Sequence, residues 1–364
     1  MHPAIDGLMY ALQDTFQDTF SASLKDGQKN IGPKRIGQKN IGFLRAELAP
    51  CFMDVLGSHT LYCHQSFKPE YDKLANAGLS VTPTLPETQP LDVVIYLPTR
   101  NREENKFMLA KATEWLKEGG VFISAQHNTM GAKQFEKDVR KLLPDVISTS
   151  KKHCRLLHAP KTRQPDSKEY NRYLALGMPS PVENTTMHTL PGLFSGKKID
   201  AGSQMLVDVI EQEDLAGRGA DFGAGWGFLS QRALKISPRI QEMHLFEAEH
   251  QALTCAEANI SNFIHHTKHK SAKIFYHWSD ISTTSLDPQF DFILCNPPQH
   301  NVSNADPTLV SQFIEQCARA LKPGGCLWLV TNAHMPAKRM LTSCFAEVEL
   351  KIRDHQYMVF RAVK

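Results

Sequence analysis

The chain has 364 residues and a formal net charge of +3, with 41% hydrophobic and 22% charged residues, 21 glycines and 21 prolines. This length usually exceeds one hydrophobic core, so two domains are expected. The composition excludes a disordered, collagen-like or fibrous protein. The longest apolar runs are far shorter than the ~20 residues of a membrane-spanning helix.

The start of the sequence has no basic stretch followed by an apolar segment, so no secretion signal is predicted. The eight cysteines include no Cys-x-x-Cys, which argues against a disulfide framework or a zinc ribbon. The His-rich stretch at residues 265–269 lacks a cysteine or carboxylate at ligand spacing, and we interpret it as a solvated loop. We therefore expect a cytoplasmic protein with no metal site and no membrane contact.

Apolar strands alternate with amphipathic helices in the first half of the chain. The segment Gly-Gln-Lys-Asn-Ile-Gly occurs twice, at 27–32 and 37–42, and we interpret it as a duplicated loop before a strand, with a binding loop as the alternative. Such alternation is typical of a parallel sheet covered by helices on both faces. Strands are predicted at 42–47, 60–65, 91–97 and 121–125, and helices at 70–77 and 104–117.

Positive charge is concentrated in two segments of this half. Residues 25–45 carry six Lys or Arg against one Asp, and residues 151–172 carry seven against one Asp and one Glu. A polyanion would bind there, although a solvated basic face is the other interpretation.

The second half repeats the pattern of the first. Residues 91–98 parallel 290–297, each a buried strand ending in proline, and the Gly-Gly pair that follows each strand begins a further alignment without gaps. We therefore predict two doubly wound α/β domains, at 1–172 and 186–364, joined by a linker at 173–185. In the second half helices are predicted at 203–212, 227–235, 250–260 and 307–321, and strands at 218–222, 241–246, 273–277, 290–295 and 325–331, with a final pair near 345–362.

A glycine-rich loop at residues 220–227 follows the first strand of the second domain. Its glycines allow positive φ and let backbone N–H groups approach a ligand at the edge where open α/β sheets bind, although a tight turn alone also uses glycine. Glu247 ends the next strand and can accept from both ribose hydroxyls of a nucleoside, with Glu249 as the alternative. Asp280 ends the third strand and either accepts from an adenine amine or closes a turn.

The fourth strand runs into Asn296-Pro297-Pro298. The prolines remove two backbone donors and fix φ, which leaves rigid carbonyls as acceptors. The side-chain oxygen of Asn296 and the carbonyl of Pro297 can accept the two hydrogens of an exocyclic base amine and aim its lone pair at an electrophilic methyl group. Positioning then supplies most of the rate, and no strong base is required. This turn decides against a dinucleotide-dependent dehydrogenase, which the loop alone would also suit.

These residues together resemble the class I S-adenosylmethionine-dependent methyltransferases that act on planar or amide nitrogens. The segments 189–195, 200–203 and 331–336, with His300, further resemble the small-subunit ribosomal RNA guanine-N2 methyltransferases of the RsmC and RlmG kind. That family has two tandem Rossmann-like methyltransferase domains, of which the first is degenerate.

The resemblance implies S-adenosyl-L-methionine as cofactor and the exocyclic amine of a guanine in 16S rRNA as methyl acceptor. Asn296, Pro297 and Pro298 would form the catalytic turn, and the segment around Asp200 and Ser203 would cap the cofactor. Ribosomal RNA or the small ribosomal subunit would be the partner of a monomer or weak dimer. The cofactor-binding residues would be Asp221, Gly223, Ala224, Gly225, Gly227, Glu247 and Asp280, and Gln299, His300 and Asn332 would border the base.

Two residues depart from the family pattern. Gln299 replaces the aromatic residue that usually follows Asn-Pro-Pro, and losing a stacking face removes ~1–3 kcal/mol of base binding. Ala337 stands where a tyrosine is usual. Neither touches the methyl-transfer residues, so we expect both to bear on the choice of substrate.

The first domain lacks this chemistry, because Leu97 replaces Asn296 and residues 44–50 contain no glycine. It either recognises RNA backbone through its basic segments, helping to offset the few kcal/mol of flipping a guanine out of a duplex, or is purely structural. Two other functions stay open: a methyltransferase for another nucleic-acid amine or a protein glutamine, and a non-catalytic RNA-binding or ribosome-assembly factor on the same fold.

Overall fold

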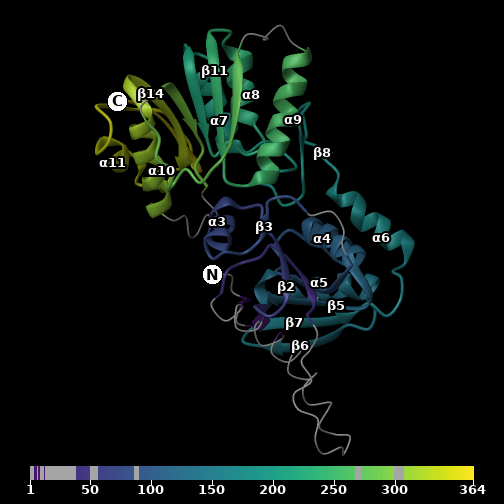
Figure 1. Ribbon diagram of the computed structural model, residues 1–364. Helices are drawn as coiled ribbons and strands as arrows, with labels where there is room; N and C mark the ends of the chain where they lie inside the picture. The colour runs from purple at the N-terminus through teal and green to yellow at the C-terminus, as the bar shows by residue number, and fades with distance from the viewer. Residues whose placement is uncertain are drawn as a thin grey trace, which may run out of the picture. The chain divides into compact units, whose positions relative to one another are not determined.

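A computed structural model describes residues 4–5, 7–8, 12, 38–49, 56–85, 90–266, 272–287, 289–298 and 307–364. Contacts divide the chain into two units, Met1–Met178 and Pro179–Lys364. Each unit contains a seven-stranded sheet with helices on both faces (Figure 1). This confirms the predicted α/β fold class with two Rossmann-like domains.

The sheet of the first unit has the order β3-β2-β1-β4-β5-β7-β6. Strands β1 to β5 are parallel, whereas β7 is antiparallel to both of its neighbours. The strands are β1 (Asn40–Leu44), β2 (Thr60–His64), β3 (Val81–Thr82), β4 (Leu91–Tyr96), β5 (Leu116–His127), β6 (Ile147–Lys151) and β7 (Cys154–Pro160). The helices are α3 (Lys68–Asn76), α4 (Arg102–Trp115), α5 (Ala132–Leu142) and α6 (Ser167–Leu174), with short turns η2 (Asn128–Met130) and η3 (Ala175–Gly177).

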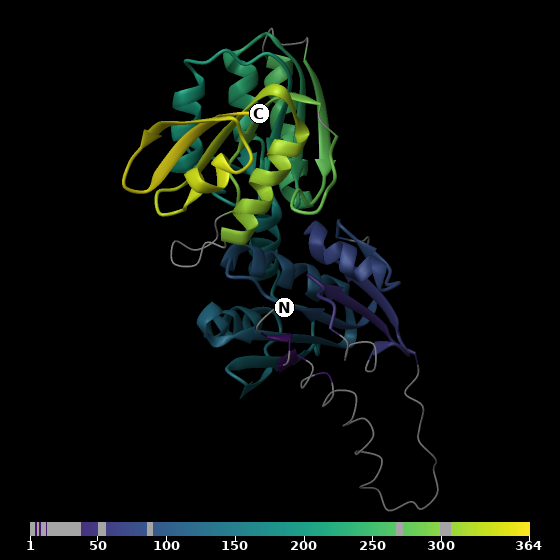
Figure 2. The same cartoon turned by 90° about the vertical axis from the view of Figure 1, so that its left-hand side faces the viewer.

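The second unit repeats this topology in the order β12-β11-β10-β13-β14-β16-β15, and Figure 2 shows its C-terminal strands in yellow at one end of the sheet. A short hairpin of β8 (Ser180–Pro181) and β9 (His188–Thr189) precedes it. The strands are β10 (Gly217–Phe222), β11 (Ile240–Glu247), β12 (Lys273–Trp278), β13 (Phe290–Cys295), β14 (Leu321–Asn332), β15 (Glu347–Arg353) and β16 (Tyr357–Val363). The helices are α7 (Ala201–Ile210), α8 (Phe228–Ile236), α9 (His250–His266), α10 (Pro307–Ala320) and α11 (Ala337–Thr342).

Two apolar cores cover the two faces of the second sheet. Leu245 and Leu294 pack into the core under α7, α8 and α9, whereas Phe246 and Ile293 pack into the core under α10 and α11. Successive residues of a strand point to opposite faces, so a strand buried on both faces must be apolar throughout. This explains why consecutive residues near the carboxyl ends of these strands are apolar.

The internal repeat extends to individual side chains. Asp92 on β4 forms an ion pair with Lys117 on β5, and Asp291 on β13 forms the corresponding pair with Lys322 on β14. The register shifts at the same place in both units, between the first and third residues of β4 and β13. The two units therefore share one scaffold at the amino-terminal edge of their central strands.

A buried lysine completes that shared scaffold. Lys161 Nζ donates to the carbonyls of Thr113 (2.8 Å) and Leu116 (2.6 Å), and Lys364 Nζ donates to the carbonyl of Leu321 (2.7 Å). Lys161 is only 7% exposed. It belongs to the basic segment 151–172, but this contact removes it from any RNA-binding surface.

The sheets differ from the predicted pattern in their last strands. The β6–β7 and β15–β16 hairpins are antiparallel, so both sheets are mixed. The first-unit hairpin was missed because β6 is polar and largely exposed. No helix in the described part of the chain is long and apolar enough to cross a membrane, and no group of three or more potential metal ligands lies among the described residues.

Candidate active site

The glycine-rich loop of the second unit requires its glycines. Gly223, Gly225 and Gly227 have φ of +80°, +55° and +88°, a backbone region that side chains disfavour. A Cβ on Gly227 would lie 3.1 Å from the Cβ of Ala256 on α9, whereas a Cβ on Gly225 would meet nothing within 4 Å. Gly227 therefore serves close helix packing, and the loop opens to free space at Gly225.

Glu247 lies directly against this loop. Its Oε2 accepts from the backbone N–H of Gly225 and its Oε1 from that of Glu249, both at 2.8 Å. Burial raises the pKa of Glu247, against the lowering effect of these backbone hydrogen bonds, and the charge of Glu249 adds to the rise. The side chain of Glu249 instead accepts from Gln251 in the first turn of α9.

Asp221 is fully buried beneath the loop. Its Oδ2 accepts from the backbone N–H (3.1 Å) and the hydroxyl (2.7 Å) of Ser230 on α8, and its Oδ1 has no hydrogen-bond partner among the described residues. Burial raises the pKa of Asp221 to about 7, opposed by the Ser230 hydrogen bonds and assisted by the charge of Glu247. Ser230 could not be named from the sequence, because nothing in the motif connects it with Asp221.

Asp280 follows β12 and closes a turn there. Its Oδ1 accepts from the backbone N–H (2.9 Å) and the hydroxyl (2.6 Å) of Ser282. Its Oδ2 accepts no hydrogen bond from the described residues, so the turn leaves one carboxylate oxygen for a ligand.

The Asn-Pro-Pro turn lies beside the glycine-rich loop. Phe222 at the end of β10 pairs with Cys295 at the end of β13, and a Cβ on Gly223 would lie 3.6 Å from the carbonyl oxygen of Asn296. Asn296 is partly exposed and Pro297 is buried. The structure therefore brings together the two motifs that the sequence separates by some seventy residues.

The side-chain amide of Asn296 is held from α7. Its Nδ2 donates to Asp200 Oδ2 (3.0 Å) and Ser203 Oγ (2.8 Å). Asp200 is also the N-cap of α7, since its Oδ2 accepts from the backbone N–H of Ser203 at 2.8 Å. The sequence indicated a role for Asp200 and Ser203 at the cofactor, but gave no sign of this contact with Asn296.

The residues expected to border the base are only partly described. Asn332 ends β14 at the same edge of the sheet, whereas Gln299 and His300 lie outside the described residues. Ala337 is fully buried in the core under α10 and α11. The alanine in place of a tyrosine therefore affects how this core packs.

The corresponding edge of the first unit carries different residues. Strand pairing places Arg45 at the counterpart of Gly223 and Gln65 at that of Glu247. Arg45 has φ of +51°, and its Nε donates to Glu104 Oε1 at 2.7 Å. Gln65 Nε2 donates to the carbonyl of Ala46 at 2.9 Å. Arg45 and Gln65 therefore have hydrogen-bond partners within the first unit, and Gln65 stands where the second unit has the Glu247 carboxylate.

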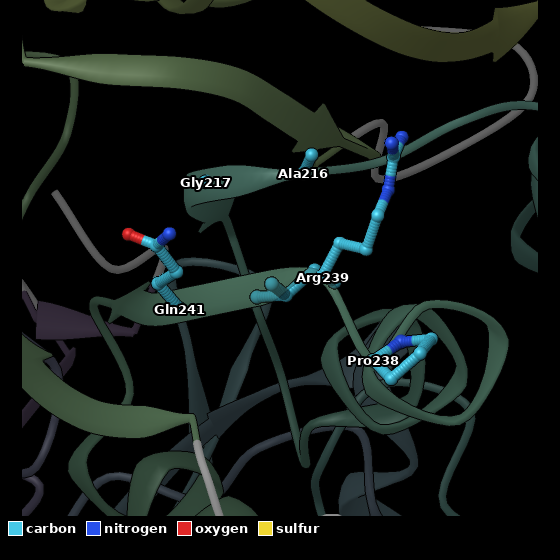
Figure 3. A pocket seen from close by; sticks show the side chains of 6 residues that line it. Ala216, Gly217, Pro238, Arg239 and Gln241 are labelled. Carbon is cyan, nitrogen blue, oxygen red and sulfur yellow. The ribbon is translucent and has the colours of Figure 1, made fainter.

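A shallow hollow lies at the opposite edge of the second sheet, where β10 and β11 begin (Figure 3). Figure 3 shows the side chain of Arg239 directed away from Gln241. The hollow is remote along the strands from the loop and the turn, so it contributes nothing to the candidate site. It is lined by Ala216, Gly217, Pro238, Arg239, Ile240 and Gln241.

Comparison with known proteins places these observations in context. Residues 184–361 match the family model described as methyltransferase small domain. Ribosomal RNA small subunit methyltransferase C of Haemophilus influenzae (strain PittGG) is 25% identical over 273 residues, which cover 74% of this chain and 78% of that protein. The protein of the same name from Shewanella pealeana is 25% identical over 326 residues, covering 88% and 91%.

One solved structure matches both units of the chain. It is the T. thermophilus 16S rRNA N2 G1207 methyltransferase, in complex with AdoMet and guanosine. The TM-score is 0.76 at 20% identity, and the match covers 96% of this chain and 92% of that one. At this sequence identity the match shows that the two proteins share a fold.

Proposed function

This chain belongs to the class I S-adenosylmethionine-dependent methyltransferases, with a methyltransferase small domain at residues 184–361, and on that premise we propose that it methylates the exocyclic amine of a guanine in 16S ribosomal RNA. The observation that carries the proposal is the contact of the glycine-rich loop with the Asn-Pro-Pro turn. A cofactor held at the loop would have its transferable group next to a turn whose oxygens accept from an amine.

The residues at the loop fit S-adenosylmethionine. Space is open beside Gly225, Glu247 as a residue is partly exposed, and buried Asp221 Oδ1 lacks a protein partner among the described residues. A carboxylate has about four lone-pair sites, so Glu247 can hold two ribose hydroxyls in addition to its two backbone N–H groups. When bound, S-adenosylmethionine supplies a methyl group on a positively charged sulfur.

The turn would hold the acceptor. The exocyclic amine of guanine is a poor nucleophile while its lone pair is delocalised into the ring. The Asn296 side-chain oxygen and the Pro297 carbonyl would accept its two hydrogens and hold them out of the ring plane, which directs the lone pair away from these oxygens. The positive charge that develops on the amine strengthens both hydrogen bonds, so they stabilise the transition state more than the ground state.

The first unit offers a surface for the RNA backbone. We define its basic face as seven of the exposed or half-exposed cations on α4, α5 and α6. Lys106 Nζ and the Arg172 guanidinium lie 5.2 and 5.3 Å from the centre of the Tyr173 ring. The members of the basic face are Arg102, Lys106, Lys133, Lys137, Lys141, Lys168 and Arg172.

Positive charge is crowded around Lys106, although some cations of the basic face also pair with Asp138 or Glu169. Burial lowers the pKa of Lys106, and repulsion from Arg102, Arg172 and Lys141 lowers it further against the attraction of Asp138. Lys133, Lys137 and Lys141 recur every four residues and so line one side of α5. Phosphate groups would relieve this repulsion, which supports RNA contact by the first unit. The basic residues 25–37 lie outside the described part of the chain.

Mapping the modified nucleotides of 16S rRNA by mass spectrometry, in cells with and without the protein, tests the proposed function. We expect one guanine N2-methyl group to disappear without the protein and to return with the wild-type chain. Loss of a different methylated amine would contradict the acceptor. An unchanged rRNA, together with no calorimetric binding of S-adenosylmethionine, would instead favour a non-catalytic ribosome-assembly factor.

A further inference from the structure

We propose that Asp200 and Ser203 are positioning residues that fix the side-chain amide of Asn296 with its oxygen facing the acceptor amine. This inference rests on the proposed function of the site. Asn296 Nδ2 donates both of its hydrogens at the start of α7, to Asp200 Oδ2 at 3.0 Å and to Ser203 Oγ at 2.8 Å.

The chemistry of the two acceptors decides the orientation of the amide. A primary amide can rotate by 180°, which exchanges its oxygen and nitrogen, and an isolated asparagine would populate both states. An ionised carboxylate can only accept, so the reversed amide would place Asn296 Oδ1 against Asp200 Oδ2 with no hydrogen between them. That state forfeits a charge-assisted hydrogen bond and adds repulsion, so Oδ1 must face away from α7.

The Asp200 charge also strengthens the remaining oxygen. Hydrogen bonds in a chain polarise one another, and an amide N–H that donates to an anion shifts electron density toward its own carbonyl oxygen. Asn296 Oδ1 thereby becomes a better acceptor for an amine hydrogen. The same contact that orients the amide therefore makes it more effective.

The start of α7 is a rigid platform for this contact. A Cβ on Gly202 would lie 2.8 Å from the ring of Tyr357 on β16 and 3.1 Å from Asp200 Oδ2, so only glycine allows this close approach. Ser203 is 8% exposed, and its backbone N–H holds the Asp200 carboxylate. Neither acceptor can move far without disturbing the helix start.

Asp200→Asn is the most informative variant. Asparagine caps helices as well as aspartate does, so α7 keeps its N-cap while the charge that selects the amide orientation is lost. We expect kcat for methyl transfer to fall ~10- to 100-fold, with KM for RNA and Kd for S-adenosylmethionine within about 2-fold of wild type. Ser203→Ala removes one acceptor and should lower kcat less. The matched control is Asp208→Asn, an exposed carboxylate on the same helix, which should retain wild-type kcat.

Coupling to Asn296 separates positioning from a general structural effect. In an Asn296→Ala background, adding Asp200→Asn should cause no further loss, because its effect passes through the missing amide. Wild-type kcat in both Asp200→Asn and Ser203→Ala would overturn the proposal. So would a weakened Kd for S-adenosylmethionine that accounts for the loss, since Asp200 would then act on the cofactor.

A measurement on the free protein keeps the inference independent of activity. The Asn296 side-chain NH2 protons, assigned in NMR spectra by their loss in Asn296→Ala, should exchange slowly with water in the wild type and faster in Asp200→Asn and Ser203→Ala. Exchange as fast as that of an exposed asparagine in the wild type would overturn the proposal. If wild-type protein transfers no methyl group but shows this protection, the proposed function fails and the positioning contact stands.

Discussion

In the proposed mechanism methyl transfer depends on Asn296, because this residue follows β13 beside the glycine-rich loop and carries the acceptor oxygen. We expect Asn296→Ala to lower kcat ~100- to 1,000-fold, the usual effect of removing one group that stabilises the transition state. Kd for S-adenosylmethionine should stay within about 2-fold. Single-turnover methyl transfer and calorimetry measure the two quantities. A variant with wild-type kcat would exclude the proposed mechanism.

Asp221 makes the stability of the second unit depend on pH. Its folded pKa of about 7 lies above the unfolded value near 4, so the folded state binds the extra proton and loses stability as pH rises from about 4 to 7. The loss is at most ~4 kcal/mol, at ~1.4 kcal/mol per pKa unit. Asp221→Asn imitates the neutral carboxyl, so its unfolding midpoint relative to wild type should rise between pH 5 and pH 8.

The test uses the change with pH of the difference in unfolding midpoint between Asp221→Asn and wild type. The size of that difference at a single pH also includes a packing cost, because the asparagine NH2 group would meet no acceptor where Oδ1 now lies. That cost is the same at every pH. A difference in unfolding midpoint that stays constant from pH 5 to pH 8 would show that Asp221 does not titrate in this range.

At the scale of an element, two glycines of the glycine-rich loop have different roles, one in cofactor binding and the other in helix packing. Gly225→Ala and Gly227→Ala both force a side chain into positive φ, at a cost of ~1–3 kcal/mol. Only the second adds a contact of 3.1 Å with Ala256, so it should lower the unfolding midpoint more. Gly225→Ala should weaken S-adenosylmethionine binding more in calorimetry. Unchanged binding would mean that the open side of the loop does not face the cofactor.

The strands of both sheets were predictable where burial on two faces demands apolar residues, as in β4 and β13. Some of the missed elements take their character from their neighbours. Strand β6 is polar and exposed, and it is a strand only because β7 supplies its hydrogen-bond partners. Helix α5 was also missed, although its buried residues recur at helical spacing.

The candidate site was predictable to the same extent. A motif such as the glycine-rich loop or Asn-Pro-Pro is local, so its residues could be named from the sequence. The contact of Asp200 with Asn296 joins residues 96 positions apart, and only the fold brings them together. Ser230 could not be predicted for the same reason. Its hydrogen bond to Asp221 forms only because the fold places Asp221 beneath α8.

At the scale of the whole molecule, the chain carries its basic face and the proposed methyl-transfer residues on different units. We expect Lys133→Glu, Lys137→Glu and Lys141→Glu combined to weaken binding to a 16S rRNA fragment. The slope of log K against log salt should fall by ~0.7–0.9 for each phosphate that the variant no longer neutralises. Fluorescence anisotropy at several salt concentrations measures both quantities. Arginine at the same three positions is the control and should retain the slope, whereas an unchanged slope in the glutamate variant would exclude this face.

The Arg45–Glu104 ion pair makes it costly to convert this edge of the first unit into a cofactor site. Restoring glycine at Arg45 would relieve the positive φ, but it would leave Glu104, whose side chain is 6% exposed, without its cation at a cost of order 3 kcal/mol. A carboxylate at Gln65 would add a second negative charge to the same edge. Converting this edge to a cofactor site would therefore have to pass through destabilised intermediates.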